Sequence, residues 1–186
     1  MTSMKPTEVL EREHQFITQV TECMALLAED LGKGQEVSTA IFADMLEFLH
    51  TFADECHHGK EESSLFRMLD KKGLPAKECP LGALRMEHDQ ARSLVGKLTN
   101  VSARYAKDGS EREALRTTLL QLVELYRGHI LKENDLLFPM TNKALSTQEQ
   151  ETLSQQFEQM DSRMGTDVSN EFEELAAKLQ HEVMHE

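Results

Sequence analysis

The sequence predicts an all-α protein, an up-down-up-down four-helix bundle with two additional C-terminal helices. Leu, Ala, Met, Glu, Gln and Lys dominate the 186 residues, aromatic residues make up only 5%, and Trp is absent. The dominant residues are good helix formers, whereas the β-branched and aromatic residues that favour strands are sparse. Turn signals divide the chain into long helical pieces with short links, which is the pattern of an antiparallel bundle.

Glycine stops bound the first two predicted helices. The first runs from about Pro6 to Leu31 and is stopped by Gly32 and Gly34, because glycine readily adopts the left-handed conformation that terminates a helix. The second begins at a Ser38 cap and ends at Gly73, directly after two lysines. Prolines at 75 and 80 mark the connection to the next helix.

Two further long helices complete the predicted bundle. The third runs from about Leu81 to Lys107 and is followed by an Asp-Gly turn. Ser110 and Glu113 have the spacing of a capping box for the fourth helix, which we expect to end before Pro139.

The remaining chain predicts a fifth and a sixth helix on the outside of the bundle. Ser146 and Glu149 repeat the capping-box spacing for a shorter fifth helix, and the sixth covers about 167–183. We therefore divide the chain into a bundle at 1–140 and a C-terminal helical extension at 141–186, packed on the same domain.

Charge and cysteine content exclude several classes of function. A formal net charge of −13 disfavours nucleic acids and anionic membranes, which need a basic surface. No apolar run approaches the 18 residues of a membrane span, and no signal peptide is recognisable, so we expect a cytoplasmic protein. Cys23, Cys56 and Cys79 form no Cys-x-x-Cys motif, so a metal site must use His and carboxylates.

An internal repeat is the most informative feature. The segments 57–66 and 129–138 share the pattern His-x-x-Lys-Glu-x-x-x-Leu-Phe. A Glu-His pair precedes each copy, at 13–14 and at 87–88. Each half of the bundle is therefore predicted to be a helical hairpin with one His on its first helix and His-x-x-x-Glu on its second, and two such hairpins form a pseudo-twofold bundle.

The repeat places four imidazoles and two carboxylates on apolar helix faces. Residues four apart on a helix point the same way, and the rows that contain these six residues are otherwise mostly apolar. Burying such groups without partners is costly, and two metal ions would compensate them. Imidazole with carboxylate suits iron or manganese. The predicted ligands are His14, His57, Glu61, His88, His129 and Glu133.

These motifs resemble the hemerythrin-like family, also called the HHE cation-binding domain. The likeness covers about residues 13–139 and rests on Glu13-His14, His57-His58-Gly59-Lys60-Glu61-Glu62, Glu87-His88 and His129-x-x-x-Glu133. The resemblance implies a hemerythrin-like helical bundle and two iron ions with an oxo or hydroxo bridge. Zinc or manganese would fit the same ligands.

Two positions depart from the oxygen-carrying members of that family. Carriers have a fifth histidine four residues after the third-helix His, where this chain has Arg92. Their second acidic bridge lies five residues after its His, where this chain has Asn134, so Glu133 must serve. The chain thus resembles a non-carrier branch with four His and two Glu, and oxygen transport is not expected.

Four more residues are candidates at the edge of the site. His58 and Glu62 lie on a polar row, so we expect a solvated face or support of the ligands, with Glu62 as an alternative extra ligand. His50 lies two turns before His57 and is a candidate for support or for an entry channel. Tyr126 either packs in the core, hydrogen-bonds an oxygen on the metals, or has a radical or redox role.

The predicted function is binding of, or reaction with, dioxygen, peroxide or nitric oxide at a diiron site in redox or stress response. Open coordination positions on two irons favour such small ligands. The alternative is an oxygen- or iron-sensing module without turnover, in which metal binding is coupled to folding. A purely structural helical adaptor is disfavoured by the buried ligand set. The pattern leaves open whether the protein is an enzyme, and whether it pairs with a partner protein or with itself.

Overall fold

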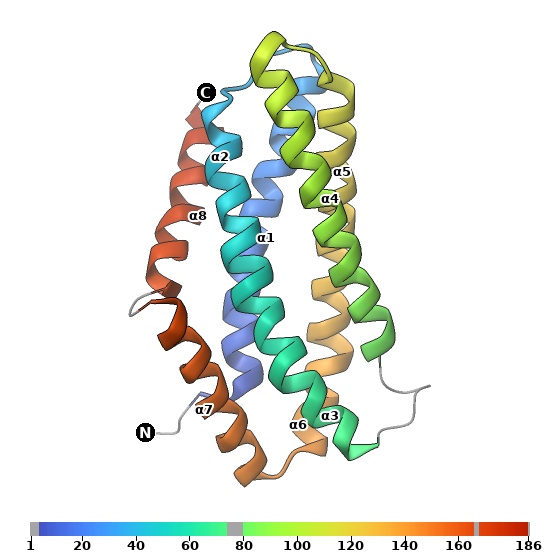
Figure 1. Cartoon of the computed structure of the whole chain (residues 1–186), viewed down its shortest axis with the longest axis vertical. Helices are drawn as coiled ribbons and strands as arrows, with labels where there is room; N and C mark the ends of the chain where they lie inside the picture. The colour runs from blue at the N-terminus through green and yellow to red at the C-terminus, as the bar shows by residue number, and fades with distance from the viewer. Residues whose placement is uncertain (1–3, 74–79, 166–167, 186) are drawn as a thin grey trace.

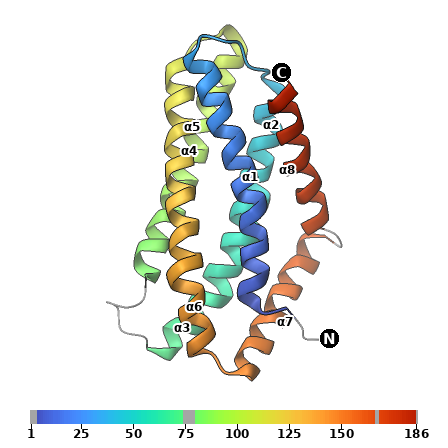
Figure 2. The same cartoon turned by 180° about the vertical axis from the view of Figure 1, so that it is seen from behind.

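The computed structural model describes residues 4–73, 80–165 and 168–185, and these residues form helices without a strand. The long helices run antiparallel, side by side, and α7 and α8 pack along one flank (Figures 1 and 2). The predicted connection at 74–79, with Cys79, and the predicted start of the last helix at 167 lie outside the described residues. Within them, the all-α prediction is confirmed.

Three helices match their predicted ranges closely. The first helix is α1 (Pro6–Gly32), the third is α4 (Leu81–Asp108), and the fifth is α7 (Thr147–Met164). The predicted capping box of α7 is present, because Ser146 accepts from the Glu149 backbone and Glu149 accepts from Ser146. The sixth helix is α8 (Val168–His185).

The second predicted helix is one continuous run, but its winding changes along its length. It consists of α2 (Ala40–Glu47), η1 (Phe48–His58), η2 (Glu61–Leu65) and α3 (Phe66–Lys72). The segments η1 and η2 are π-helical, with i→i+5 hydrogen bonds and a wider turn than an α-helix. The predicted Ser38 cap is wrong, because Thr39 holds the cap position without a side-chain bond. The predicted stop is confirmed, since Gly73 is left-handed with φ 63°.

The fourth predicted helix differs at both ends. It starts as α5 (Arg112–Lys132), and the residue before it, Glu111, is left-handed with no side-chain cap, so the predicted Ser110 capping box is wrong. It continues through the π-helical η3 (Glu133–Leu137) into α6 (Phe138–Ala144), past Pro139. Pro139 lies in the first turn of α6, where its missing N–H costs least because the hydrogen-bond register changes there.

Two apolar clusters hold the bundle on either side of its middle. The larger joins α1, η1, α4 and α5, and it includes Phe172, Ala176 and Leu179 of α8. The smaller lies at the other end and includes Leu153 and Phe157 of α7. The two C-terminal helices therefore share the core of the bundle. In the described part of the chain, no helix has the length and apolarity of a membrane span.

Candidate metal centre

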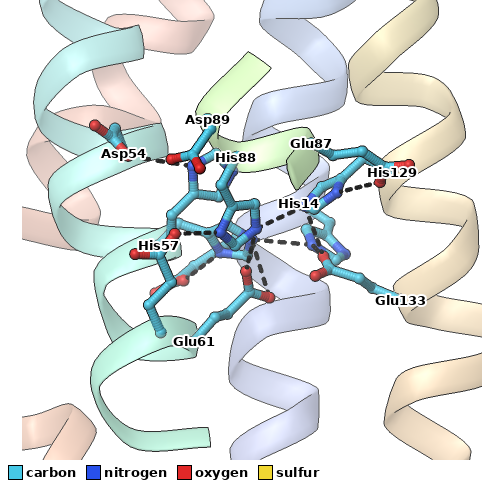
Figure 3. A network of polar contacts seen from close by, with 12 residues as sticks. His14, Asp54, His57, Glu61, Glu87, His88, Asp89, His129 and Glu133 are labelled. Carbon is cyan, nitrogen blue, oxygen red and sulfur yellow. Dashed lines mark hydrogen bonds and ion pairs between the residues drawn. The ribbon is translucent and has the colours of Figure 1, made fainter. Parts of the chain in front are cut away.

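The structure brings all six predicted ligands together between the two apolar clusters. Each is at most 3% exposed. Figure 3 shows their side chains converging from the facing helices of the bundle. The contributing elements are α1 for His14, η1 for His57, η2 for Glu61, α4 for His88, α5 for His129 and η3 for Glu133.

The four histidines form two pairs whose Nε2 atoms face each other. His14 Nε2 lies 3.0 Å from His57 Nε2, and His88 Nε2 lies 3.2 Å from His129 Nε2. In His57, His88 and His129 the Nδ1 atom lies against a carboxylate, which only accepts when ionised, so Nδ1 carries the proton. The corresponding Nε2 atoms then carry lone pairs, and two lone pairs at this separation repel each other unless a proton or a metal ion lies between them.

The two carboxylates connect the histidine pairs. Glu61 directs Oε1 to His57 Nε2 at 3.6 Å and Oε2 to His88 Nε2 at 3.3 Å. Glu133 Oε2 lies 3.1 Å from His14 Nε2 and 3.4 Å from His129 Nε2. Among the described residues, none of the four carboxylate oxygens has a hydrogen-bond partner. Two overlapping groups of four potential ligands therefore share both glutamates.

The electrostatics of the site favour neutral imidazoles and oppose two bare carboxylates. Burial lowers the pKa of His57 and of His88, so both rings are neutral. Burial, with the charge of Glu133, raises the pKa of Glu61 well above its usual range. Burial opposes the ionisation of Glu133 as well, but His129 and His14 outweigh it and lower the pKa of Glu133. Without a cation, the pair therefore favours one charge rather than two.

The outer nitrogens of two ligands bind carboxylates that the repeat also supplies. His57 Nδ1 donates to Glu13 Oε2 at 2.9 Å, and Glu13 accepts from Lys60. In the other half, His129 Nδ1 donates to Glu87 Oε2 at 3.0 Å, and Lys132 bonds Glu87. Such outer partners fix the tautomer and orientation of a metal-binding imidazole.

The other two histidines are held across the pseudo-twofold axis. His14 Nδ1 lies 2.8 Å from Asn134 Oδ1, and His88 Nδ1 lies 2.6 Å from Glu62 Oε1. Glu62 and Asn134 both follow a histidine of the repeat by five positions. Glu62 therefore contacts the outer nitrogen of a predicted ligand, as the supporting role, one of its three predicted roles, requires.

Sequence reasoning missed most of these outer partners. The repeat contained the signal, because its Glu-His pairs and its lysines recur in both halves. The missed residues are Glu13, Lys60, Glu87, Lys132 and Asn134.

The prediction that His58 lies on a solvated face is wrong. His58 is 1% exposed, and its ring stacks on that of His88 with centroids 3.9 Å apart. Its Nδ1 lies 3.3 Å from Asp54, and it joins His88 and His129 in a third group of potential ligands. The prediction used α-helical periodicity, whereas the π-helical winding of η1 shifts the faces along the run.

A cavity of about 300 Å³ extends from the surface to His58. His50 is exposed and lines it, as the entry-channel prediction requires, and Tyr126 is buried against it. In the described part of the chain, no group hydrogen-bonds the Tyr126 hydroxyl. Arg92, at the place of the carriers' fifth histidine, pairs with Asp54 and Glu62 instead. The cavity is lined by Leu49, His50, Asp54, His58, Ala91, Arg92, Val95 and Tyr126.

The bundle and its core of imidazoles and carboxylates define a helical cation-binding protein. A family model described as "Hemerythrin HHE cation binding domain" matches residues 5–141, which is most of the chain. The chain therefore belongs to the hemerythrin HHE cation-binding domain family. Comparison with curated proteins and with solved structures gives no match. The matched range covers every predicted ligand and ends before α7.

Proposed function

We propose that the protein holds two iron ions and binds or reacts with dioxygen, peroxide or nitric oxide. The observation that carries the proposal is the set of four buried carboxylate oxygens on Glu61 and Glu133, for which the described part of the chain provides no hydrogen bond. Each unpaired buried acceptor costs about 1–3 kcal/mol, and metal ions would remove this cost. Iron suits the mixed imidazole and carboxylate donor set, although other divalent ions fit it as well.

The proposed ligand roles follow from the contacts. His14 and His57 would hold one ion, His88 and His129 the other, and the two glutamates would bridge them. The iron pair would supply the electrons for reduction of a small oxygen or nitrogen species. The protein would exclude water, hold the imidazoles as neutral ligands and fix their orientation through the carboxylates at Nδ1.

The cavity next to His58 supports a route for the small ligand. Its walls include Leu49, Ala91 and Val95, which suit an uncharged diatomic molecule or peroxide. The Tyr126 hydroxyl has no hydrogen-bond partner among the described residues, and His58 lies between the cavity and His88. We propose that an entering ligand passes the exposed His50 and then meets the buried Tyr126 and His58.

A sensing module without turnover is the second candidate. It is favoured by a contact between the C-terminal extension and the surroundings of the site, since Asp161 of α7 lies 2.6 Å from Lys60. Metal loading would then change how tightly α7 packs on the bundle, and a partner protein would bind differently to the two states.

Turnover separates the two candidates. The iron-loaded protein is mixed with hydrogen peroxide or nitric oxide and a chemical reductant, and consumption is followed over many equivalents. Sustained consumption that is lost in Glu133→Gln supports reaction at the site. Consumption of no more than one equivalent per site, together with strong metal-dependent protection of α7 amides from hydrogen exchange, supports the sensor. Iron-loaded protein that does neither contradicts both candidates.

A further inference from the structure

Helix α7 reaches the surroundings of the metal centre at one end of the site. Asp161 Oδ1 lies 2.6 Å from Lys60 Nζ, and Lys60 also bonds the carboxylate of Glu13. Glu13 in turn accepts from His57 Nδ1 at 2.9 Å. A series of alternating charges therefore connects α7 to an imidazole of the first histidine pair.

The pseudo-twofold counterpart of this series is one residue shorter. Lys132 bonds Glu87, which accepts from His129 Nδ1. Across the described ranges, Glu87 is the one carboxylate that pairs with Lys132. The side chain of Lys132 is 37% exposed, whereas that of Lys60 is 1% exposed. Solvent therefore takes the place at Lys132 that Asp161 takes at Lys60.

The packing of α7 explains this asymmetry. Its Met160 methyl lies 3.2 Å from where a Cβ would stand on Gly59, and Met160 Sδ accepts a hydrogen bond from Ser63. The position equivalent to Gly59 in the second copy of the repeat is Leu131, which is 61% exposed. Helix α7 thus covers one copy of the repeat and leaves the other open; Figure 1 shows α7 on one flank of the bundle.

The same contacts exclude a third metal position there. Glu13, Cys56 and Asp161 have ligand atoms close enough to hold an ion. The Lys60 ammonium contacts both carboxylates. A cation of the protein itself therefore neutralises this group.

We propose that Asp161 is a positioning residue of the metal centre, which strengthens ion binding at His14 and His57 but not at His88 and His129. The inference rests on the proposed function, because it requires two bound ions. Without the Asp161 carboxylate, the positive charge of Lys60 is less compensated and repels an ion at His14 and His57 more strongly. Lys60 also draws Glu13 more strongly, which makes Glu13 a weaker acceptor for His57. Both effects weaken binding of that ion.

The expected loss of metal affinity is moderate, because Asp161 does not contact the predicted ligand His57 directly. Changing a group that directly hydrogen-bonds a metal ligand typically costs about 10- to 100-fold in affinity. Asp161 acts through Lys60 and Glu13, so we expect a loss of about 3- to 10-fold at one position. The second position should keep its affinity.

The test compares Asp161→Asn with Glu158→Gln in the full chain. Glu158 is exposed on the same helix, three residues earlier, so the control removes the same charge. Metal-free protein is titrated anaerobically with isotopically enriched Fe²⁺, and binding steps and Mössbauer signals are recorded. The wild type should show two distinguishable irons. Asp161→Asn should weaken one step 3- to 10-fold and shift one signal, Glu158→Gln should change neither, and Asp161→Glu should restore the wild-type behaviour.

Several results would overturn the inference. Two irons of equal affinity and identical signals in the wild type would do so, as would equal shifts of both signals in Asp161→Asn. An Asp161→Asn protein that matches Glu158→Gln, or an Asp161→Glu protein that matches Asp161→Asn, would also contradict it. These results leave the proposed diiron site intact. A wild-type chain that binds no iron would overturn both the proposed function and this inference.

Discussion

The carboxylate of Glu61 is fully buried, and neither of its oxygens has a hydrogen-bond partner among the described residues. Substitution Glu61→Gln removes the cost of burying that charge or of protonating the carboxyl group. The neutral amide can donate to the lone pair of His57 or of His88, which lie 3.6 and 3.3 Å from the two carboxylate oxygens. We therefore expect the metal-free protein to become more stable, although the change is in the core.

The expected gain is about 1–3 kcal/mol, the usual cost of an unpaired buried polar group. For a chain of this length the unfolding entropy is about 0.4 kcal/mol/K, so Tm should rise by about 3–8 °C. The metal-loaded protein should respond in the opposite direction, because the amide is a poor bridging ligand. The rise in Tm that metal gives the wild type should largely disappear in the variant.

Thermal unfolding with and without metal measures both expected changes in Tm. Glu158→Gln on the surface of α7 serves as the control, and it should change Tm little in either state. A lower Tm in metal-free Glu61→Gln would refute the reasoning. A lower Tm would mean that the Glu61 side chain has favourable partners within the metal-free protein and does not need a cation.

Three further predictions follow from the surroundings of the site. Lys60→Met should lower the free energy of unfolding by about 3–5 kcal/mol, because it leaves a buried carboxylate without its cation. Lys132→Met, at the more exposed ion pair, should lower it by at most about 1 kcal/mol. Chemical denaturation measures both changes, and equal changes would contradict the difference between the two ion pairs. Glu13→Gln and Glu87→Gln should each weaken metal binding by about 10- to 100-fold in a competition titration, and unchanged affinities would exclude a role for the Nδ1 partners. Burial lowers the pKa of several histidines, so below about pH 6.5 the unfolded state of the metal-free protein takes up protons that the folded state does not. Its free energy of unfolding should therefore fall below pH 6.5 by up to about 1.4 kcal/mol per pH unit for each such residue, and a flat profile in denaturation between pH 5 and 7 would contradict this. These residues are His57, His58 and His88.

The convergence of the six predicted ligands could be foreseen from the sequence because the motif occurs twice in the chain. A repeated His-x-x-x-Glu on an apolar face is a local pattern, and helical periodicity alone places both residues on one side. The structure brings the six side chains together as that pattern requires.

The residues around the ligands were harder to predict for two physical reasons. His58 turns inward because η1 is π-helical, and nothing in the local sequence announces a change from α-helical winding. Asp161 contacts Lys60 from a helix about a hundred positions later, and such a contact depends on how α7 packs. At the N-terminus of α5, the predicted Ser110 cap is wrong although its spacing fits, because Glu111 adopts the left-handed conformation there.

We propose that this bundle holds two iron ions between four imidazoles and two bridging glutamates. Iron content and an absorption spectrum of protein purified from iron-replete cells test it most directly. We expect two irons per chain and a charge-transfer band in the near ultraviolet, both lost in a variant with Glu61→Gln and Glu133→Gln. A fully folded wild-type protein that contains no metal and takes up none when Fe²⁺ is supplied would contradict it.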